Sequence, residues 1–211
     1  MSFIAFCQTK PENFVYLTDI EPTIQSELRY LSNNNFIGKP IQGYVNNCVI
    51  VTNKTALALQ KVQQELLSKG LSLKVFDAYR PQKAVNHFVK WAKVMNDTLM
   101  KKEYYPDVPK SELFKRGYIA SKSGHTRGST VDLTIIDVKT NKELDMGSPY
   151  DFFGVASHPF YKNISKTQIK NRMLLREVML KHQFKPYENE WWHFTLKNEP
   201  YPNSYFNFNI E

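Results

Sequence analysis

Two separate segments of the chain carry the histidines and carboxylates that could perform chemistry. His125 and Asp132 lie seven residues apart in the first segment, and Glu190 and His193 lie three residues apart in the second. Two histidines and one carboxylate, with a further carboxylate to move protons, are the side chains of a hydrolytic zinc site that keeps one position open for water. A second interpretation stays open, because a histidine in a loop rich in serine and glycine is often only a loop residue.

The spacing of the first pair requires an irregular backbone. Residues 129–136 are mostly β-formers and are predicted to form a strand. Side chains alternate between the faces of a strand, so an offset of seven would send His125 and Asp132 to opposite faces. Gly128 can break the extended run with a turn or a bulge. We therefore expect His125 on a loop that curls back over the face carrying Asp132.

The second pair poses the same geometric problem. Its segment, Glu-Trp-Trp-His-Phe-Thr, is aromatic and β-rich and is bracketed by Pro186 and Pro200, which favours a strand over a helix. An offset of three on a regular strand would point Glu190 away from His193. We therefore expect Glu190 at the irregular entry to the strand.

Length, composition and charge favour one domain with a basic exterior. The chain has 211 residues, 42% of them hydrophobic and 14% aromatic, which is enough for a core. We expect a single domain over 1–211, with an irregular region at 1–50. The formal net charge is +8, but lysines and arginines are spread along the sequence, with no run longer than the pair Lys101-Lys102. This pattern argues against a nucleic-acid partner, whose electrostatic footprint should cluster.

The cysteines and the N-terminus bear on the compartment. Cys7 and Cys48 have no metal-binding company and are predicted to be free thiols, which is typical of a reducing compartment. The N-terminus lacks the basic start and apolar run of a signal peptide, and no stretch approaches the roughly 18 apolar residues of a membrane span. We predict a cytoplasmic protein without a membrane partner, or a periplasmic one if a signal peptide was removed before residue 1. The oligomeric state is not indicated.

The chain alternates helical and extended patterns. Helices are predicted over 55–69, after Asn53 as N-cap, over 82–95, with Met95 closing its buried stripe, and over 165–182, with Ile169 facing inward. Short strands are predicted at 14–17 and 71–75, and a hairpin turn at 137–142. A loop is predicted at 96–110 and a short helix at 110–116. The aromatic tail at 201–211 is expected to pack back on the body of the protein. The order favours an α+β fold, a small, mostly antiparallel sheet with helices packed on one face.

Four further residues could be structural rather than functional. Arg80 precedes Pro81 where a strand turns into a helix, so its guanidinium could face a developing oxyanion or form a surface salt bridge. Tyr30 and Tyr44 could be half-buried core tyrosines. Asp151 lies among aromatic residues and is either desolvated for a purpose or directed to water.

These residues fall in motifs that resemble VanX-type D-alanyl-D-alanine dipeptidases, zinc peptidases that share Ser-x-His-x-x-Gly-x-Ala-x-Asp and Glu-x-x-His. The resemblance extends from about Tyr30 to Phe208. It includes Gly38-Lys39-Pro40, Gly43-Tyr44, Tyr79-Arg80-Pro81, Ser121-Lys122-Ser123, Glu190-Trp191-Trp192-His193 and Glu199-Pro200-Tyr201-Pro202-Asn203-Ser204-Tyr205-Phe206.

The resemblance implies a fold, a reaction and a set of site residues. It implies a LAS/hedgehog-like metallopeptidase fold with the zinc site in a cleft on the sheet, and hydrolysis of D-alanyl-D-alanine to two D-alanines. The residues that match the family's site are His125, Asp132 and His193 for one zinc ion, Glu190 for the catalytic base, Arg80 for the transition state, and Ser123, Tyr30, Tyr44 and Asp151 around the dipeptide. Tyr30 and Asp151 match positions near the dipeptide's free ammonium group, and the 1–50 region is expected to contribute to this pocket.

Two residues depart from the family pattern. Thr130 stands where the wider motif has alanine, and Gly124 stands where close relatives often have serine, at the carboxylate end of the substrate. Neither change removes a metal ligand. Two alternatives stay open: a related zinc D,D-carboxypeptidase or peptidoglycan endopeptidase with an open site, and a non-catalytic zinc-containing binding module, against which the spare Glu190 argues. The physiological role also stays open between vancomycin resistance and recycling of cell-wall fragments.

Overall fold

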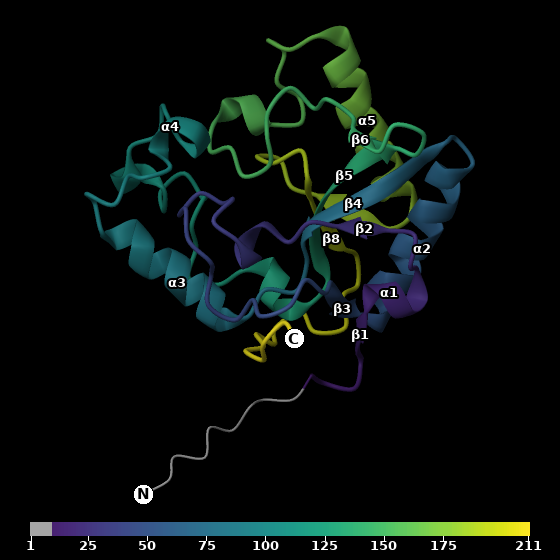
Figure 1. The fold of residues 1–211 in the computed structure, drawn as a ribbon, viewed down its shortest axis with the longest axis horizontal. Coiled ribbons are helices and arrows are strands. Elements are labelled where there is room, and N and C mark those ends of the chain that lie inside the picture. Colours follow the sequence, from purple (N-terminus) through teal and green to yellow (C-terminus); the bar gives the residue numbers. More distant parts are fainter. Residues whose placement is uncertain (1–9) are drawn as a thin grey trace, which may run out of the picture.

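The computed structural model describes residues 10–211, which form the predicted α+β fold around a six-stranded sheet (Figure 1). Its strands are β2 (Gln25–Ser26), β4 (Leu71–Asp77), β5 (Thr130–Asp137), β6 (Lys142–Glu143), β7 (Phe184–Pro186) and β8 (His193–Leu196). The order is β2-β4-β5-β8-β7, with β6 paired to the end of β5, and only the β2–β4 pair is parallel. A separate two-stranded sheet pairs β1 (Phe14–Tyr16) with β3 (Ile50–Thr52).

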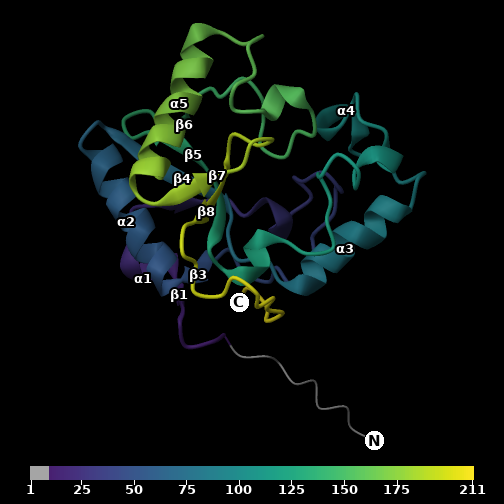
Figure 2. The same cartoon turned by 180° about the vertical axis from the view of Figure 1, so that it is seen from behind.

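The helices surround this sheet unequally. They are α1 (Leu17–Ile20), α2 (Asn53–Leu67), α3 (Gln82–Lys93), α4 (Lys101–Tyr104) and α5 (Lys166–Lys181), with 3-10 turns η1 (Arg29–Leu31), η2 (Lys110–Glu112), η3 (Gly124–Arg127) and η4 (Val155–Ser157). Helices α2 and α5 form the expected layer on one face: α2 packs on β4, α5 packs on β7, and the two helices contact each other. In contrast, α3 lies past the carboxyl end of β4, across the molecule from α2 (Figures 1 and 2). Within residues 10–211, no helix is long and apolar enough to cross a bilayer.

The strand register brings three polar side chains to one face of the sheet. Asp77 at the end of β4 pairs with Asp132 of β5, and Asp132 pairs with His193 at the start of β8. Residues directly opposite each other on neighbouring strands point to the same face. The sheet therefore presents two carboxylates and an imidazole side by side.

The boundaries of two predicted helices differ because polar residues set them. Helix α2 begins at Asn53, with Thr52 rather than Asn53 at the N-cap, and the Thr52 hydroxyl bonds to that of Thr55 at 2.8 Å. Helix α3 ends at Lys93, so the prediction of a buried Met95 is wrong: Met95 is 54% exposed. The Lys110 ammonium donates to the carbonyl of Val94 at 2.7 Å, where the chain leaves the helix. A cation that binds the last carbonyls of a helix stabilises its end.

Several predictions for residues 96–182 also differ from the structure. Ile169 was predicted to face inward but is 37% exposed, because the buried stripe of α5 starts instead with the guanidinium of Arg172. The predicted loop at 96–110 contains the short helix α4, and the predicted helix at 110–116 is only the turn η2. Cys48 is a half-buried free thiol, whereas Cys7 lies outside the described residues.

The C-terminal tail packs back on the body, as predicted. Phe206 contacts the ring of Phe14 with a centroid distance of 5.0 Å, and Phe208 stacks on Tyr79 at 4.0 Å. One hydrophobic cluster contains residues from Phe14 to Ile210. The two ends of the described chain are therefore held in a common core.

Gly128 makes the turn that was predicted between His125 and β5. It follows η3 with a φ of 77°, in the left-handed region that favours glycine. A Cβ atom at this position would lie 2.1 Å from Cε1 of Phe14, far inside contact distance. The close approach of the Phe14 ring therefore requires glycine here, in addition to the backbone conformation.

We expect Gly128→Ala to lower the free energy of unfolding by roughly 3 kcal/mol, since it combines left-handed backbone strain with overpacking. Gly70→Ala is the matched control, because Gly70 has a φ of 72° but nothing within 4 Å of its added Cβ. The control should lose only about 1 kcal/mol. Urea unfolding of the two variants measures the difference, and equal losses would show that the Phe14 contact is unimportant.

Candidate metal centre and active site

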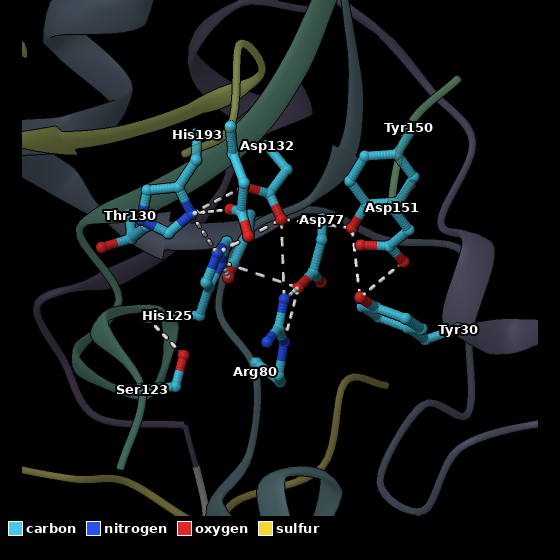
Figure 3. Close-up of polar contacts among 12 residues, drawn as sticks. Tyr30, Asp77, Arg80, Ser123, His125, Thr130, Asp132, Tyr150, Asp151 and His193 are labelled. Atoms are coloured by element: carbon cyan, nitrogen blue, oxygen red, sulfur yellow. Dashed lines mark hydrogen bonds and ion pairs between the residues drawn. The ribbon is translucent and has the colours of Figure 1, made fainter. Parts of the chain in front are cut away.

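Three side chains predicted to bind a metal converge on one point (Figure 3). They come from η3, β5 and β8. The Nε2 atom of His125 lies 3.3 Å from Nδ1 of His193, and the Asp132 oxygens lie 3.3 Å from the first nitrogen and 3.0 Å from the second. Two ligand atoms that are each about 2.0–2.1 Å from a tetrahedral zinc ion are about 3.3 Å apart. The spacing of the two nitrogens fits this geometry, and each of them has a different oxygen of Asp132, Oδ2 and Oδ1 respectively, at a similar distance.

The protonation and burial of these groups also fit a cation. Nδ1 of His125 lies 2.7 Å from the carbonyl oxygen of Ala78, which can only accept, so Nδ1 donates and Nε2 is left with its lone pair. Burial lowers the pKa of His125, which favours the neutral ligand form. Oδ1 of Asp132 is buried and accepts no hydrogen bond. Among the described residues this buried oxygen has no hydrogen-bond donor, and a cation bound beside the two imidazoles would satisfy it.

Glu190 lies beside this group, outside β8, as predicted. Its Oε2 atom is 3.4 Å from Nδ1 of His193, and it lines the same cavity. Burial, with the negative charge of Asp132 adding to it, raises the pKa of Glu190 to about 7. A carboxyl group with a pKa near neutrality can both take and release a proton, as general acid–base chemistry requires.

Arg80 is held in the cavity by a carboxylate that the sequence analysis did not single out. Its Nε and Nη2 atoms lie 2.8 and 2.7 Å from Oδ2 of Asp77, and its side chain is only 12% exposed. Nη2 is also 3.5 Å from Oδ2 of Asp132, and the guanidinium lies over the Tyr30 ring at 5.1 Å. Arg80 is therefore a buried, oriented cation and not a surface salt-bridge residue. The signal for Asp77 was its position three residues before Arg80, at the end of the same strand.

Tyr44 lies behind Arg80, outside the wall of the cavity. Its hydroxyl donates to Oδ1 of Asp77 at 2.6 Å, while Arg80 occupies the other oxygen. Tyr44 is buried, and it is absent from the residues that line the cavity. The structure therefore connects Tyr44 to the site through Asp77.

Asp151 is a buried carboxyl group at the other end of the cavity. It is 6% exposed, and its Oδ2 atom accepts a 2.8 Å hydrogen bond from the hydroxyl of Tyr30. Burial, reinforced by the charge of Asp132, raises the pKa of Asp151 well above its usual range. Of the two interpretations of Asp151, the structure supports the desolvated one. A buried carboxyl group that lines a cavity and lacks a cationic partner is suited to an ammonium group.

Ser123 and the two departures from the family pattern lie around η3. The Ser123 hydroxyl accepts a hydrogen bond from the backbone N–H of His125 at 3.3 Å and lines the cavity. A Cβ atom at Gly124 would lie 2.7 Å from Oγ1 of Thr130, and that hydroxyl bonds to the hydroxyl of Thr195 at 2.8 Å. The two departures are therefore coupled, because the threonine occupies the space that a side chain at position 124 would need.

Tyr150 is a further residue of the site that sequence reasoning missed. Its hydroxyl lies 3.1 Å from Oδ2 of Asp132 and 3.3 Å from the hydroxyl of Tyr30 (Figure 3). Nothing in the sequence distinguished it from the other aromatic residues around Asp151. Its position depends on how the loop after β6 folds over the sheet.

One cavity of about 310 Å³, near the lower limit for ligand pockets, is lined by the three metal donors together with Glu190, Arg80, Ser123, Tyr30 and Asp151. The three metal donors lie in one part of it and Asp151 lies in another, with Arg80 between them over the ring of Tyr30 (Figure 3). Aromatic and aliphatic side chains complete the wall, among them Phe36, Val85, Phe88, Tyr118, Phe153 and Tyr187. The cavity can therefore hold a small polar molecule between a metal and a buried carboxyl group.

Comparison with known proteins agrees with the motifs. The family model of peptidase M15, described as D-ala-D-ala dipeptidase, matches residues 10–211. A D-alanyl-D-alanine dipeptidase of Enterococcus faecalis is 41% identical over 93% of this chain and 98% of its own length. Proteins of the same name from Enterococcus faecium and Escherichia coli are 39% and 31% identical, over 94% and 86% of this chain and 98% and 83% of their own lengths. The resemblance predicted from the motifs is confirmed, and the chain belongs to peptidase family M15, a family of metallopeptidases.

Proposed function

We propose that this chain hydrolyses the dipeptide D-alanyl-D-alanine to two D-alanines, with one zinc ion held by His125, Asp132 and His193. The observation that carries the proposal is the small cavity with these three donors in one part and the buried Asp151 in another. The dipeptidase names of relatives that cover nearly all of the chain support the substrate. The proposal treats residues 1–211 as one catalytic domain, because one hydrophobic cluster extends from Phe14 to Ile210.

Glu190 is the proton carrier in this proposal. Zinc at such a site acidifies a water molecule and polarises a carbonyl group. Glu190 accepts the proton of the attacking water and then donates it to the amine that leaves. A pKa of about 7 suits both steps, since neither protonation state is strongly disfavoured near neutral pH.

Arg80 stabilises the oxygen that gains negative charge. Asp77 accepts from two of its nitrogens and Tyr44 holds Asp77, so the guanidinium is fixed before the substrate arrives. Pre-organised donors of this kind typically contribute about 3–4 kcal/mol to the transition state. Tyr44 therefore serves the reaction through Arg80.

Asp151 and Tyr30 select a free dipeptide. The ionised Asp151 pairs with the terminal ammonium group, and the Tyr30 hydroxyl fixes the carboxylate through the 2.8 Å hydrogen bond. Ser123, at the start of η3, faces the carboxylate end of the dipeptide. An N-acylated peptide offers no charge to Asp151 and adds volume where the cavity is closed by buried side chains. The burial of Asp151 and Tyr30 favours a dipeptidase over a carboxypeptidase or endopeptidase.

The proposal is tested by comparing free D-alanyl-D-alanine with its N-acetyl derivative. We expect kcat/KM for the free dipeptide to be at least about 100-fold higher, which corresponds to about 2.7 kcal/mol of lost recognition. Asp151→Asn should raise KM for the free dipeptide and shrink this ratio. Equal turnover of both peptides by the wild type would indicate a carboxypeptidase, and no hydrolysis of either would reject the activity.

The Asp151→Asn variant carries its own control for folding. Because the pKa of Asp151 is raised in the folded protein, stability is lost as pH rises from the ordinary carboxyl pKa of the unfolded chain up to the folded value. The amide has no such cost, so the substrate-free variant should unfold at a higher temperature than the wild type at pH 8, and by a smaller margin at pH 4. A higher KM in a more stable protein separates lost recognition from lost structure.

Removal of a metal ligand gives a second prediction. His125→Ala should reduce bound zinc from about one ion per chain to nearly none after dialysis, because two remaining donors bind zinc weakly. Metal content by mass spectrometry measures this directly. His87→Ala, on α3 and outside the donor group, is the matched control and should keep its metal. Full retention of zinc by His125→Ala would reject the ligand assignment.

Glu190→Gln should separate metal binding from turnover. The amide keeps the size of the side chain but cannot carry the proton, so kcat should fall by about 10²–10⁴-fold with zinc still bound. Glu188→Gln, two residues away and exposed, should leave kcat unchanged. Stopped assays of D-alanine release, with zinc content measured on the same samples, make the comparison. An active Glu190→Gln variant would remove Glu190 from the proton transfer.

A further inference from the structure

We propose that Tyr150 is a positioning residue for the metal site: its hydroxyl binds one oxygen of Asp132 so that only the other oxygen is free to bind the metal. The inference rests on the proposed assignment of Asp132 as a zinc ligand. It concerns how that ligand is oriented, and it gives a function to a tyrosine that lies outside the predicted set of site residues.

The two oxygens of Asp132 have different surroundings. Oδ2 accepts from the hydroxyl of Tyr150 at 3.1 Å and lies 3.5 Å from Nη2 of Arg80. Oδ1 is buried, accepts no hydrogen bond and lies 3.0 Å from Nδ1 of His193. One oxygen therefore accepts from a hydroxyl and faces a guanidinium, whereas the other meets only the imidazole of His193, itself a proposed metal ligand, which favours binding to the metal through a single oxygen.

Without Tyr150, both oxygens would be within reach of the metal. Oδ2 is 3.3 Å from Nε2 of His125, so each oxygen of Asp132 already faces one of the two ligand nitrogens. Carboxylates bind metals through one or two oxygens, and hydrogen bonds to the ligand decide between these modes. The Tyr150 hydroxyl opposes the two-oxygen mode, which would also occupy the position that the water needs.

The single proton of the Tyr150 hydroxyl has two possible acceptors, and the geometry assigns it to Asp132. The alternative acceptor, the hydroxyl of Tyr30, is farther away at 3.3 Å and is a neutral group. A carboxylate is the stronger acceptor. Tyr30 in turn gives its own proton to Asp151 at 2.8 Å, so each of the two tyrosines serves a different carboxyl group.

The ring of Tyr150 is fixed in place by its neighbours. Phe76 stacks on it with centroids 4.7 Å apart, and Trp192 meets it edge-on at 5.4 Å. Phe76 precedes Asp77, and Trp192 precedes His193, so both contacts come from the strands or strand entries that carry the site. The hydroxyl therefore cannot move away from Asp132 without displacing the rings of Phe76 and Trp192.

The test uses Co²⁺ as the probe and Tyr150→Phe as the variant, which removes only the hydroxyl. We expect the dissociation constant for Co²⁺, measured by competition with a chelator, to rise by about 10-fold or more, the usual effect of losing a hydrogen bond to a metal ligand. We also expect weaker visible absorption from bound Co²⁺, because absorption is stronger in four-coordinate sites than in sites of higher coordination number. A residue that only filled space would change neither reading.

Tyr30→Phe is the matched control, since it removes a buried hydroxyl from the same cluster but leaves the contact between Tyr150 and Asp132 intact. Its dissociation constant and spectrum should equal those of the wild type, and thermal unfolding of both metal-free variants should show similar losses of stability. An unchanged dissociation constant or spectrum in Tyr150→Phe, with a wild type that binds Co²⁺, overturns the role of Tyr150 alone. A wild type that binds no Co²⁺ overturns the metal site itself.

Discussion

The register of β4, β5 and β8 is the constraint on which the site depends. It fixes Asp77, Asp132 and His193 opposite one another on one face of the sheet, in an interior that excludes most water. Two neighbouring carboxylates in such a place repel each other and lose hydration, so each needs its own compensation. Asp77 obtains it from Arg80 and Tyr44, and Asp132 from the two imidazoles and the Tyr150 hydroxyl. Two turns position these partners. The turn at Gly128 places His125 over the sheet, and the junction after β4 places Arg80 beside Asp77.

The loop between β6 and α5 carries Tyr150 and Asp151, and the buried guanidinium of Arg172 holds this loop in place. The guanidinium of Arg172 on α5 donates to the carbonyl oxygens of Met146, Ala156 and His158 at 2.6–2.8 Å. A loop wrapped around fixed donors can keep Asp151 at a φ of 61°, a conformation that few residues other than glycine adopt. Burial lowers the pKa of Arg172 to about 10, which still leaves it charged at neutral pH. The charge in α5 therefore orders the segment that carries Tyr150 and Asp151, although it touches neither side chain.

Sequence patterns over a few neighbouring residues predicted the turn and the strand boundary of the site. Alternation along a strand required a turn at Gly128 and placed Glu190 outside β8, and both expectations were correct. The same rules failed where a charged side chain replaced an apolar one in the interior. Lys110 binds the carbonyls at the end of α3 and Arg172 opens the buried stripe of α5, so Met95 and Ile169 were placed wrongly. The site role of Tyr150 and the position of Tyr44 could not be predicted for another reason: they depend on long-range packing, which no short window of sequence contains. Asp77 had a local signal, but its place opposite Asp132 depends on strand register. The coupling of Gly124 to Thr130 is of the same kind, since it appears only when η3 lies over β5.

The charges in the cavity explain why a metal and an ammonium group belong there together. Asp132, Asp151 and Glu190 line one small cavity with Arg80 and Lys122, and the guanidinium of Arg80 is already paired with Asp77. The pKa values of Asp151 and Glu190 are both raised, by burial first and by the charge of Asp132 second. Burial and the neighbouring negative charge therefore work against the ionised forms of Asp151 and Glu190. A cation between His125, Asp132 and His193 offsets the charge of Asp132, and an ammonium group at Asp151 favours the ionised form of that residue. In the proposed reaction, the zinc ion and the ammonium group of a free dipeptide would supply the positive charge that these carboxyl groups lack, and an N-acylated peptide carries no ammonium group.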